Sequence, residues 1–484
     1  MLRINKMKHK LLGALIAIAS ILISCSRVEE SVIEGMFPDY SDVSIPYNIA
    51  PLNFRINGAG SIKVTVRGKE KEYVFHGRKG LVKFPLKRWH SMLEAEKGGK
   101  LDISVSARGR KGDDFSASFC WTVVGDRIDK YLSYRLIEPA YEVWESIQIE
   151  QRDIENFSTR LLGDNRSASY CCMNCHTSNK SGTTFMHLRG AKGGTILNRN
   201  GRIIKLNTKT DKTGTAVYGD ISQNGRYGVF TTADVTFVLH SRRDLRMEVY
   251  DKRSDLIVID LDNLTVTDSP ATTGDEFQET FPCFSADGKH IFFCRARHFT
   301  QPDSIRNMHY DIAAVDFDPE TGKMGDEVKT LVSVGENYSF SHLKASPDGR
   351  WLMATVAQYG TFPIWHQESD LWMLDLVNNT IDMLPGINAY GADTYHSWSS
   401  NSRWVVFASK RDDQVYGRPY IAYIGPDGTV GKPFLLPQRD PDKYLTTIKS
   451  FNIPELYDIS ELYNAKEIST FYNKVETQQV KYKP

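Results

Sequence analysis

Five consecutive residues carry the clearest chemistry in this sequence. Cys172-Met173-Asn174-Cys175-His176 is a Cys-x-x-Cys-His motif, in which two thiols three positions apart are followed directly by an imidazole. This is the attachment pattern of c-type haem, in which the thiols bind the two vinyl groups and the imidazole ligates the iron. We therefore expect Cys172, Cys175 and His176 to bind one haem c.

The iron of such a haem has a second axial position, which is either filled or open. His187 follows His176 by eleven residues, within Met186-His187-Leu188-Arg189-Gly190, and is the candidate for that ligand. Arg189 and Lys192 are cationic and close in sequence, so they are candidates for pairing with the haem propionates. A histidine held by ordinary packing and cations in water are the alternatives.

Three other interpretations of the motif stay open. Zinc could bind Cys171, Cys172, Cys175 and His176, although zinc sites usually draw a second ligand pair from further along the chain. A Cys-x-x-Cys redox pair usually opens a helix in a thioredoxin-like unit, and no such unit is visible. A structural disulfide is the third. The haem interpretation is favoured because haem c is attached outside the cytoplasm and the N-terminus independently predicts export.

The N-terminus predicts an exported, lipid-anchored protein. Four basic residues within the first ten precede an uncharged run from Leu11 to Ile23, which has the length of a signal-peptide core. The run ends at Leu22-Ile23-Ser24-Cys25, which resembles the lipobox of bacterial lipoproteins and implies cleavage before Cys25 and lipidation of its thiol. Ser26 after that cysteine implies the outer membrane, on its periplasmic or surface face. A plain secretory signal peptide is the alternative.

The composition is that of an ordinary globular chain. Of 484 residues, 41% are hydrophobic and 25% are charged, which allows two or three domains. Lys and Arg number 60 against 59 Asp and Glu, so no basic excess indicates nucleic acid as a partner. The membrane is expected to be reached through the lipid on Cys25 and not through a basic patch. With one long apolar run only, a polytopic membrane protein is excluded.

Two patterns precede and surround the motif. Apolar residues alternate at every second position from Ile62 to Val66, from Leu101 to Ala107 and from Phe115 to Val123, which predicts the half-buried strands of a small β-sandwich. Between residues 131 and 165 the apolar residues approach helical spacing, which predicts one or two amphipathic helices at a junction. The haem is then expected to be buried between this junction and the following domain.

A turn motif occurs four times in the second half of the chain. Its copies are SQNGR at 222–226, SADGK at 285–289, SPDGR at 346–350 and SSNSR at 399–403, and an apolar or aromatic strand follows each. Ser and Asp or Asn side chains bond nearby backbone N–H groups, and Gly adopts a left-handed conformation, which together produce tight hairpins. Such a repeat, with two hairpins in each period, predicts the blades of a β-propeller.

This repeat resembles the TolB-type β-propeller, whose turns read S-P-D-G-K/R, over roughly residues 185–455. Ser402 departs from that pattern because Gly is usual there. Four turns and the strands around 195–206 give five blades, and a closing blade gives six, which we favour. A β-domain followed by Cys-x-x-Cys-His and such a propeller also resembles a group of Bacteroidetes lipoproteins, a resemblance that brings no reaction with it.

Several other residues have a predicted place in the propeller. His342 and His396 precede repeat turns and are expected on innermost strands that line the channel, where His366 could join them in a polar or metal-binding pore; packing histidines are the alternative. Cys283 and Cys294 flank one hairpin turn and either form a disulfide or stay as buried thiols.

Together these features predict a mainly β protein. The expected parts are a signal peptide (1–24), a lipidated tether (25–45), a β-sandwich (46–126), a helical junction with the haem segment (127–184), a TolB-like propeller of five to six blades (185–456) and a C-terminal tail (457–484). The predicted function is an envelope lipoprotein with covalent haem c that transfers electrons or serves a redox partner protein. A haem-free propeller that binds an envelope protein or glycan is the alternative. The sequence has no G-x-S-x-G, P-loop or dinucleotide motif, so a non-enzymatic role is favoured.

Overall fold

The structure is a computed structural model that describes residues 35–109, 114–139, 146–199, 201–298, 302–460 and 463–484, apart from the side chains of residues 174, 175 and 302–304. The predicted signal peptide and the lipidation site Cys25 lie outside these residues. Within the described ranges, no helix is both long and apolar enough to cross a membrane.

The N-terminal part is a sheet of eight strands in the order β1-β3-β6-β5-β4-β7-β8-β2. The strands are β1 (Met36–Phe37), β2 (Val43–Pro46), β3 (Phe54–Ile56), β4 (Ala59–Arg67), β5 (Glu72–Arg78), β6 (Leu81–Val82), β7 (Lys100–Gly109) and β8 (Asp114–Val124). The predicted alternation is confirmed, since Ile62, Val64 and Val66 are buried along β4. All eight strands are joined in one continuous hydrogen-bonded order.

Two further corrections concern this part of the chain. The predicted tether was too long at its C-terminal end, because β1 and β2 lie within residues 25–45 and pair with β3 and β8. Helix α2 (Leu86–Ala95) was not predicted, and it buries Trp89, Met92 and Leu93. The Trp89 ring packs edge-on against that of Trp121 at a centroid distance of 5.5 Å, which fixes the helix to the sheet.

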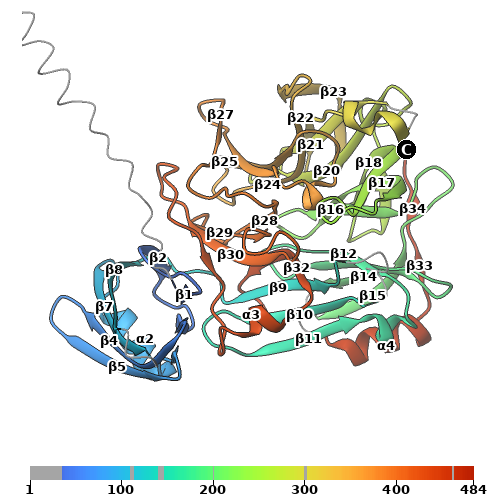
Figure 1. The fold of residues 1–484 in the computed structure, drawn as a ribbon. Helices are drawn as coiled ribbons and strands as arrows, with labels where there is room; N and C mark the ends of the chain where they lie inside the picture. Colours follow the sequence, from blue (N-terminus) through green and yellow to red (C-terminus); the bar gives the residue numbers. More distant parts are fainter. Residues whose placement is uncertain (1–34, 110–113, 140–145, 200, 299–301, 461–462) are drawn as a thin grey trace, which may run out of the picture. The chain divides into compact units, whose positions relative to one another are not determined.

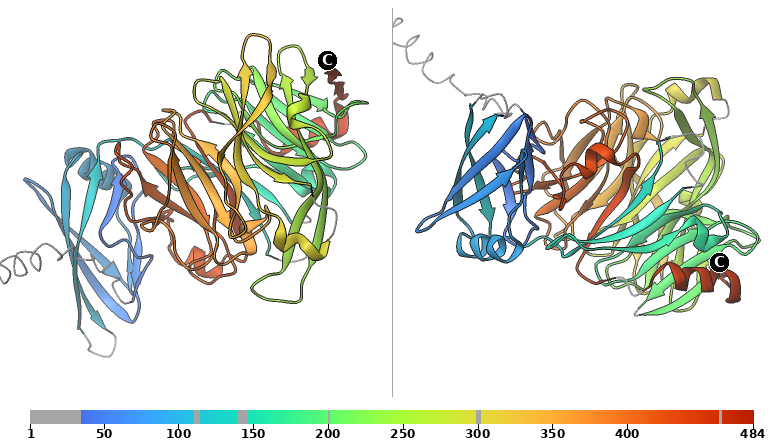
Figure 2. Two further views of the ribbon diagram at one scale, coloured as in Figure 1. Left: turned by 90° about the horizontal axis from the view of Figure 1, so that it is seen from above. Right: turned by 60° about the horizontal axis from the view of Figure 1, so that its bottom comes forward.

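Six further sheets follow, arranged as the blades of a propeller (Figures 1 and 2). The first is β9 (Tyr131–Ile137), β10 (Gln148–Asp153), β11 (Thr159–Asp164) and β32 (Ser450–Tyr457); the second is β12 (Met173–Ser178), β13 (Thr184–Leu188), β14 (Gly194–Arg199), β15 (Arg202–Asn207) and β33 (Gln478–Gln479); the third is β16 (Ala216–Ile221), β17 (Tyr227–Leu239), β18 (Met247–Asp260), β19 (Thr265–Thr267) and β34 (Lys481–Tyr482). The fourth is β20 (Phe277–Phe284), β21 (His290–Arg297), β22 (Asp311–Asp318) and β23 (Lys323–Val332); the fifth is β24 (Ser339–Ala345), β25 (Trp351–Ala357), β26 (Asp370–Asp375) and β27 (Thr380–Met383); the sixth is β28 (Asp393–Trp398), β29 (Trp404–Ser409), β30 (Arg418–Tyr423) and β31 (Phe434–Leu435). The fold is a six-bladed β-propeller.

The ring is closed by a strand from the far end of the chain. Strands β12, β16, β20, β24, β28 and β32 each contact the next in a closed circle, so they are the innermost strands of the six blades. In the first blade, β32 pairs with β9, and residues 131–164 supply the other three strands. The predicted helical junction at 127–184 is therefore wrong, because this segment forms most of one blade and the start of the next.

The segment after residue 457 is also part of the fold, although a tail was predicted. Helix α4 (Ala465–Lys474) buries Ile468 and Tyr472 in the core between the first two blades. The short strands β33 and β34 then add in parallel to β15 and β19. This extra pairing covers the outer edges of two blades, where unpaired backbone groups would otherwise face water.

The predicted turns are confirmed in detail. In the third copy, Ser346 Oγ donates to Asp348 Oδ1 at 2.6 Å and accepts from the Trp351 N–H at 2.9 Å. Ser402, which departs from the glycine of the other copies, has the same left-handed backbone with φ 61°. Its hydroxyl accepts a hydrogen bond from the Asp348 N–H at 2.9 Å, so the departure ties one turn to the turn of the neighbouring blade.

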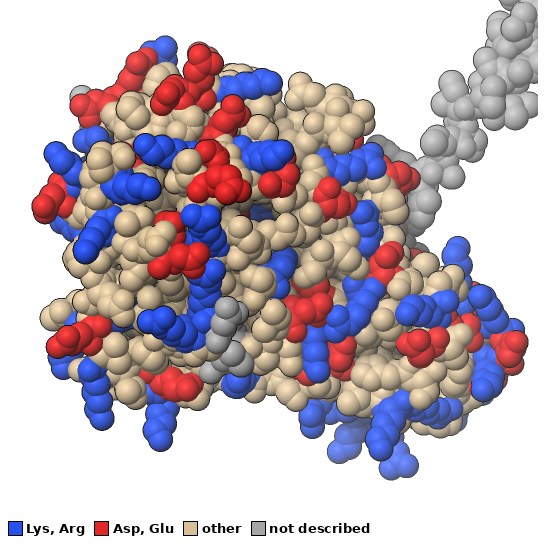
Figure 3. Space-filling view, turned by 180° about the vertical axis from the view of Figure 1, so that it is seen from behind, with Lys and Arg blue, Asp and Glu red and all other residues tan. Residues whose placement is uncertain are grey.

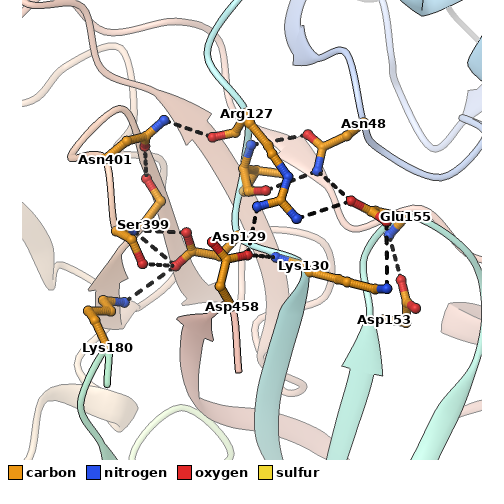
Figure 4. A network of polar contacts seen from close by, with 12 residues as sticks. Asn48, Arg127, Asp129, Lys130, Asp153, Glu155, Lys180, Ser399, Asn401 and Asp458 are labelled. Carbon is orange, nitrogen blue, oxygen red and sulfur yellow. Dashed lines mark hydrogen bonds and ion pairs between the residues drawn. The ribbon is translucent and has the colours of Figure 1, made fainter. Parts of the chain in front are cut away.

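A polar network joins the start of the first blade to the turn of the sixth (Figure 4). The carboxylate of Asp129 accepts hydrogen bonds from the N–H and hydroxyl of Ser400 at 3.0 Å and lies 3.7 Å from Lys180 Nζ. Arg127 pairs with Asp458 at 2.8 Å and with Glu155 at 3.2 Å. These contacts connect the segment before the first blade to Ser400 and Asp458. Asp129 is only 3% exposed, so its contacts are largely shielded from water.

Surface charge is mixed. On the face shown in Figure 3, basic and acidic side chains are interspersed without a large field of one sign. This agrees with the near-neutral composition and gives no sign of a nucleic-acid surface on that face.

Candidate functional site

The Cys-x-x-Cys-His motif lies on an innermost strand of the propeller. Strand β12 holds Met173–Ser178, so four of the five motif residues belong to a strand that borders the central channel, and Cys172 directly precedes it. His176 is 9% exposed and lines the channel. The motif therefore belongs to the propeller itself and not to a helical junction.

All six innermost strands share one irregularity. Each has a register shift against the second strand of its blade, and in five of them a residue with positive φ lies at the shift. These residues are Tyr218, Phe281, His342, Tyr395 and Ile453, with φ between 26° and 52°. In β12 the shift lies between Asn174 and Thr177. In a regular strand, residues three apart lie on opposite faces, and the shift interrupts that alternation inside the motif.

These five residues form a ring around the middle of the channel. The His342 ring lies between those of Phe281 and Tyr395, at centroid distances of 4.1 and 4.6 Å. Left-handed backbone is costly for such side chains, by about 1 to 3 kcal/mol each, and is concentrated at functional sites in proteins. The ring is thus a candidate binding surface, and it narrows the channel between its two ends.

A larger cavity of about 490 Å³ lies at the end of the channel where the innermost strands begin; we call it the entry cavity. Most of its walls are apolar. They come from the β17–β18 hairpin, from the short 3-10 helix Pro363–Trp365 with Phe362 before it, and from the first blade: Val235, Phe237, Met247, Val249, Phe362, Ile364, Trp365, Ile137 and Ile147. Tyr218 and Tyr395 of the ring also line it, so it opens onto the ring. Its volume lies within the range of small-molecule and cofactor sites.

The polar groups of the entry cavity include the thiol of Cys172, the first residue of the motif, and that of Cys171 before it. Cys171, Cys172, Arg135, Arg189, Lys410 and Glu138 line it. Burial raises the pKa of the Cys172 thiol, and the nearby Arg189 and Arg135 oppose that effect only in part. Redox-active cysteines have a lowered pKa, so Cys172 is a protonated thiol unlike those of dithiol oxidoreductases.

His176 is held by a carboxylate from the closing strand. Its Nδ1 lies 3.3 Å from Glu455 Oε2, and the Thr177 hydroxyl donates to Glu455 Oε1 at 3.3 Å. Lys344 Nζ lies 4.0 Å from the same carboxylate and 3.4 Å from Asp220. A carboxylate at Nδ1 fixes the imidazole tautomer and leaves Nε2 as the nitrogen available to a metal. Glu455 was not predicted, because it is 279 residues from His176 and only ring closure brings them together.

His187 is not brought to the same place. It lies on β13 opposite Asn174, its Nδ1 is 3.2 Å from the Thr195 hydroxyl, and it does not line the channel or the entry cavity. Burial, with Arg189 nearby, lowers the pKa of His187 to about 4, so the ring is neutral. The alternative of a packing histidine fits this position. Among the described residues, no group of three or more His, Cys, Asp or Glu side chains is arranged to hold a metal ion.

Two of the three other predicted histidines line the channel, and the two other predicted cysteines do not form a disulfide. His342 and His396 line the channel as predicted, and burial lowers the pKa of each to about 3, so both are neutral. His366 instead pairs with Glu368 at 2.9 Å and lines neither the channel nor the entry cavity. Cys283 and Cys294 are buried free thiols and not a disulfide.

No protein-family model and no curated protein matches this sequence. Solved structures with a similar fold include a GH74 enzyme of Niastella koreensis (10% identity, 64% of this chain and 46% of that chain, TM-score 0.40). Hydrazine synthase of Kuenenia stuttgartiensis is another (11%, 65% and 48%, 0.38), as is the β-propeller domain of Cps50 from Myceliophteria thermophila (11%, 54% and 85%, 0.29). Likenesses of this size concern the fold and carry no argument about activity.

Proposed function

We propose that this protein is an envelope lipoprotein that carries one c-type haem in the entry cavity of its propeller and transfers electrons to or from a protein partner. The observation that carries the proposal is the placement of the motif. Cys172, which directly precedes the innermost strand β12, lines an apolar cavity of about 490 Å³, and His176 on β12 lines the adjoining part of the channel with its Nδ1 beside a buried carboxylate. When bound, the haem supplies a one-electron redox centre.

The residues present fit such a group in three respects. Cys172, with Cys175, would hold the vinyl groups as thioethers, and His176 Nε2 would ligate the iron. The apolar walls would exclude water from the porphyrin, while Arg135 and Arg189 at the cavity match its two carboxylates. Glu455 would orient His176 by accepting from its Nδ1–H. His187 has no part in this arrangement.

The decisive experiment is the detection of covalent haem. The exported chain is produced with a cytochrome c maturation system, and a pyridine haemochrome spectrum is recorded beside a haem-stained denaturing gel. We expect a haem band at the mass of the protein. Cys172→Ala with Cys175→Ala removes the band, whereas the matched control Cys120→Ala, at an unrelated cysteine of β8, keeps it. No haem in the unaltered chain, under conditions that mature a control cytochrome, would refute the proposal and leave a haem-free binding propeller.

The anchor at Cys25 is tested separately. We expect the unaltered protein in the membrane fraction and a Cys25→Ala variant, with its signal peptide, outside that fraction. Protease treatment of intact cells then distinguishes the periplasmic from the surface face of the outer membrane. Equal membrane association of both proteins would contradict lipidation.

A further inference from the structure

One buried amine in the entry cavity is unlike every other cation there. Lys410 follows β29, is 3% exposed and lines the cavity. Its Nζ lies 3.2 Å from the centroid of the Trp365 ring and has no hydrogen-bond partner among the described residues. Buried polar groups in proteins are nearly always hydrogen-bonded, so an unpartnered amine at a cavity wall calls for an explanation.

The surrounding charges do not provide a partner. Burial lowers the pKa of Lys410 far below its usual range, Arg246 lowers it further, and only Asp413 opposes them. Asp413 is engaged elsewhere, since its Oδ1 accepts from the N–H groups of Val415 and Tyr416 and its Oδ2 lies 3.9 Å from Arg418. Arg246 donates a hydrogen bond to the Pro139 carbonyl, and its guanidinium lies over the Trp365 ring, which Lys410 also contacts. The amine of Lys410 therefore borders the ligand-free cavity with a lowered pKa and without an ion-pair partner among the described residues.

We infer that Lys410 is the anion anchor of the entry cavity and binds the carboxylate of a ligand with an otherwise apolar body. The amine and its cationic neighbours Arg135 and Arg189 outnumber Glu138 among the charged groups of the lining. The wall beside Lys410 is aromatic and aliphatic, with Trp365, Ile364 and Phe362. One amine in such a wall matches a singly charged group, whereas a phosphate dianion would leave a second charge unmatched in an apolar setting.

Binding then has a definite proton balance. Burial lowers the pKa of the amine and so favours its neutral form in the free protein, whereas the carboxylate is ionised in water at neutral pH. When they meet in the cavity, Nζ takes one proton from the solvent and the ammonium donates a charge-assisted hydrogen bond to the carboxylate. The inference goes beyond the haem proposal because it does not need covalent attachment. A porphyrin propionate and the head group of a fatty acid share the required chemistry.

The test uses the full chain produced without haem maturation, with two carboxylates and their neutral counterparts. The pairs are protoporphyrin IX with its dimethyl ester, and dodecanoate with dodecan-1-ol. Isothermal titration in two buffers of different ionisation enthalpy measures both the affinity and the number of protons taken up. We expect one carboxylate to bind with uptake of about one proton, and Lys410→Met to weaken it about tenfold or more while abolishing the uptake.

The controls separate anchoring from folding. Lys410→Arg keeps a cation and is expected to retain most of the affinity, and Lys466→Met, at an exposed lysine of α4, leaves binding unchanged. Loss of porphyrin binding alone, or of dodecanoate binding alone, supports the inference and identifies the source of the carboxylate. Binding of neither carboxylate, affinity unchanged in Lys410→Met, or equal affinity for the ester or alcohol would each overturn it. Covalent haem is scored separately by the haemochrome spectrum, so each proposal can fail without the other.

Discussion

Replacement of Lys410 by methionine tests the state of the ligand-free cavity directly. The unfolded chain carries a protonated lysine up to a pH near 10.4, whereas burial lowers the pKa of Lys410 in the folded protein. Between those two pKa values the unfolded state binds one more proton than the folded state, so this residue makes the free energy of unfolding rise with pH. For a single proton the slope is about 1.4 kcal/mol per pH unit.

The expected result is a difference between two stability curves. Urea unfolding of the ligand-free protein and of Lys410→Met is measured from pH 8 to pH 10. Relative to the variant, the unaltered protein gains stability over this range, at up to about 1.4 kcal/mol per pH unit, because methionine has no proton to exchange. The variant is also more stable at pH 8, since it no longer buries an unpartnered amine. Parallel curves for the two proteins would mean that Lys410 is solvated or paired, and the reasoning about the cavity would fail.

Three other predictions follow from single contacts. His187→Ala is expected to leave the haem spectrum of the matured protein unchanged, because His187 faces Thr195 and not the cavity; a changed spin state would place it at the iron. Phe451→Ala is expected to lower the free energy of unfolding by about 3 to 5 kcal/mol in denaturant titration, because this fully buried ring belongs to the closing strand β32. A loss below about 1 kcal/mol would argue against closure of the ring by β32. Ser346→Ala is expected to cost about 1 to 2 kcal/mol by the same assay, since its hydroxyl makes two hydrogen bonds in the turn, whereas Ser333→Ala, at a half-exposed hydroxyl with a 3.3 Å contact, serves as the weaker control.

The propeller was predictable from the sequence because its signals are local. Each turn copy bonds its own backbone, and each following strand alternates or is buried on both faces. The second blade escaped the turn search because Asn179 stands where the other copies have serine. Its Oδ1 accepts from the N–H groups of Ser181 and Thr183 at 3.1 and 2.9 Å, and Gly182 has φ 84°. This turn closes with a bond from the Asn179 N–H to the Thr183 carbonyl, one residue earlier than in the serine copies, and Ser181 and Thr183 also depart from the repeated pattern.

The first blade was mistaken for helix for a physical reason. Ile147, Ile154 and Leu161 are spaced seven apart, which matches two helical turns. In the structure they belong to a hairpin, where Ile147 precedes β10, Ile154 follows it and Leu161 lies on β11. The spacing is coincidental, because Leu161 is only partly buried and its neighbour Leu162 is the residue of that arm that packs in the core with Ile147. The innermost strand of this blade, β32, follows almost 300 residues later, and no local pattern reveals such a pairing.

Some residues of the candidate site could likewise be predicted from the sequence, and others could not. The motif and the channel histidines His342 and His396 could be found because they are recognisable by type and by their distance from a repeat turn. Glu455 and Lys410 could not, because each acquires its place only when the ring closes and loops of several blades meet over the channel. Short segments predict export and haem attachment, whereas the cavity proposed to hold the haem is formed by residues from several blades.

The repeated register shift explains how such a motif can stand inside a propeller blade. In the other blades this position holds Tyr218, Phe281, His342, Tyr395 and Ile453, and their positive φ turns the innermost strand toward the channel at one level. The shift in β12 falls at that same level, between Asn174 and Thr177. A motif that normally lies on a helical turn thus occupies the part of β12 where side chains do not alternate strictly between the two faces of the strand. The proposed haem attachment would therefore need only particular side chains at an irregularity that all six innermost strands share.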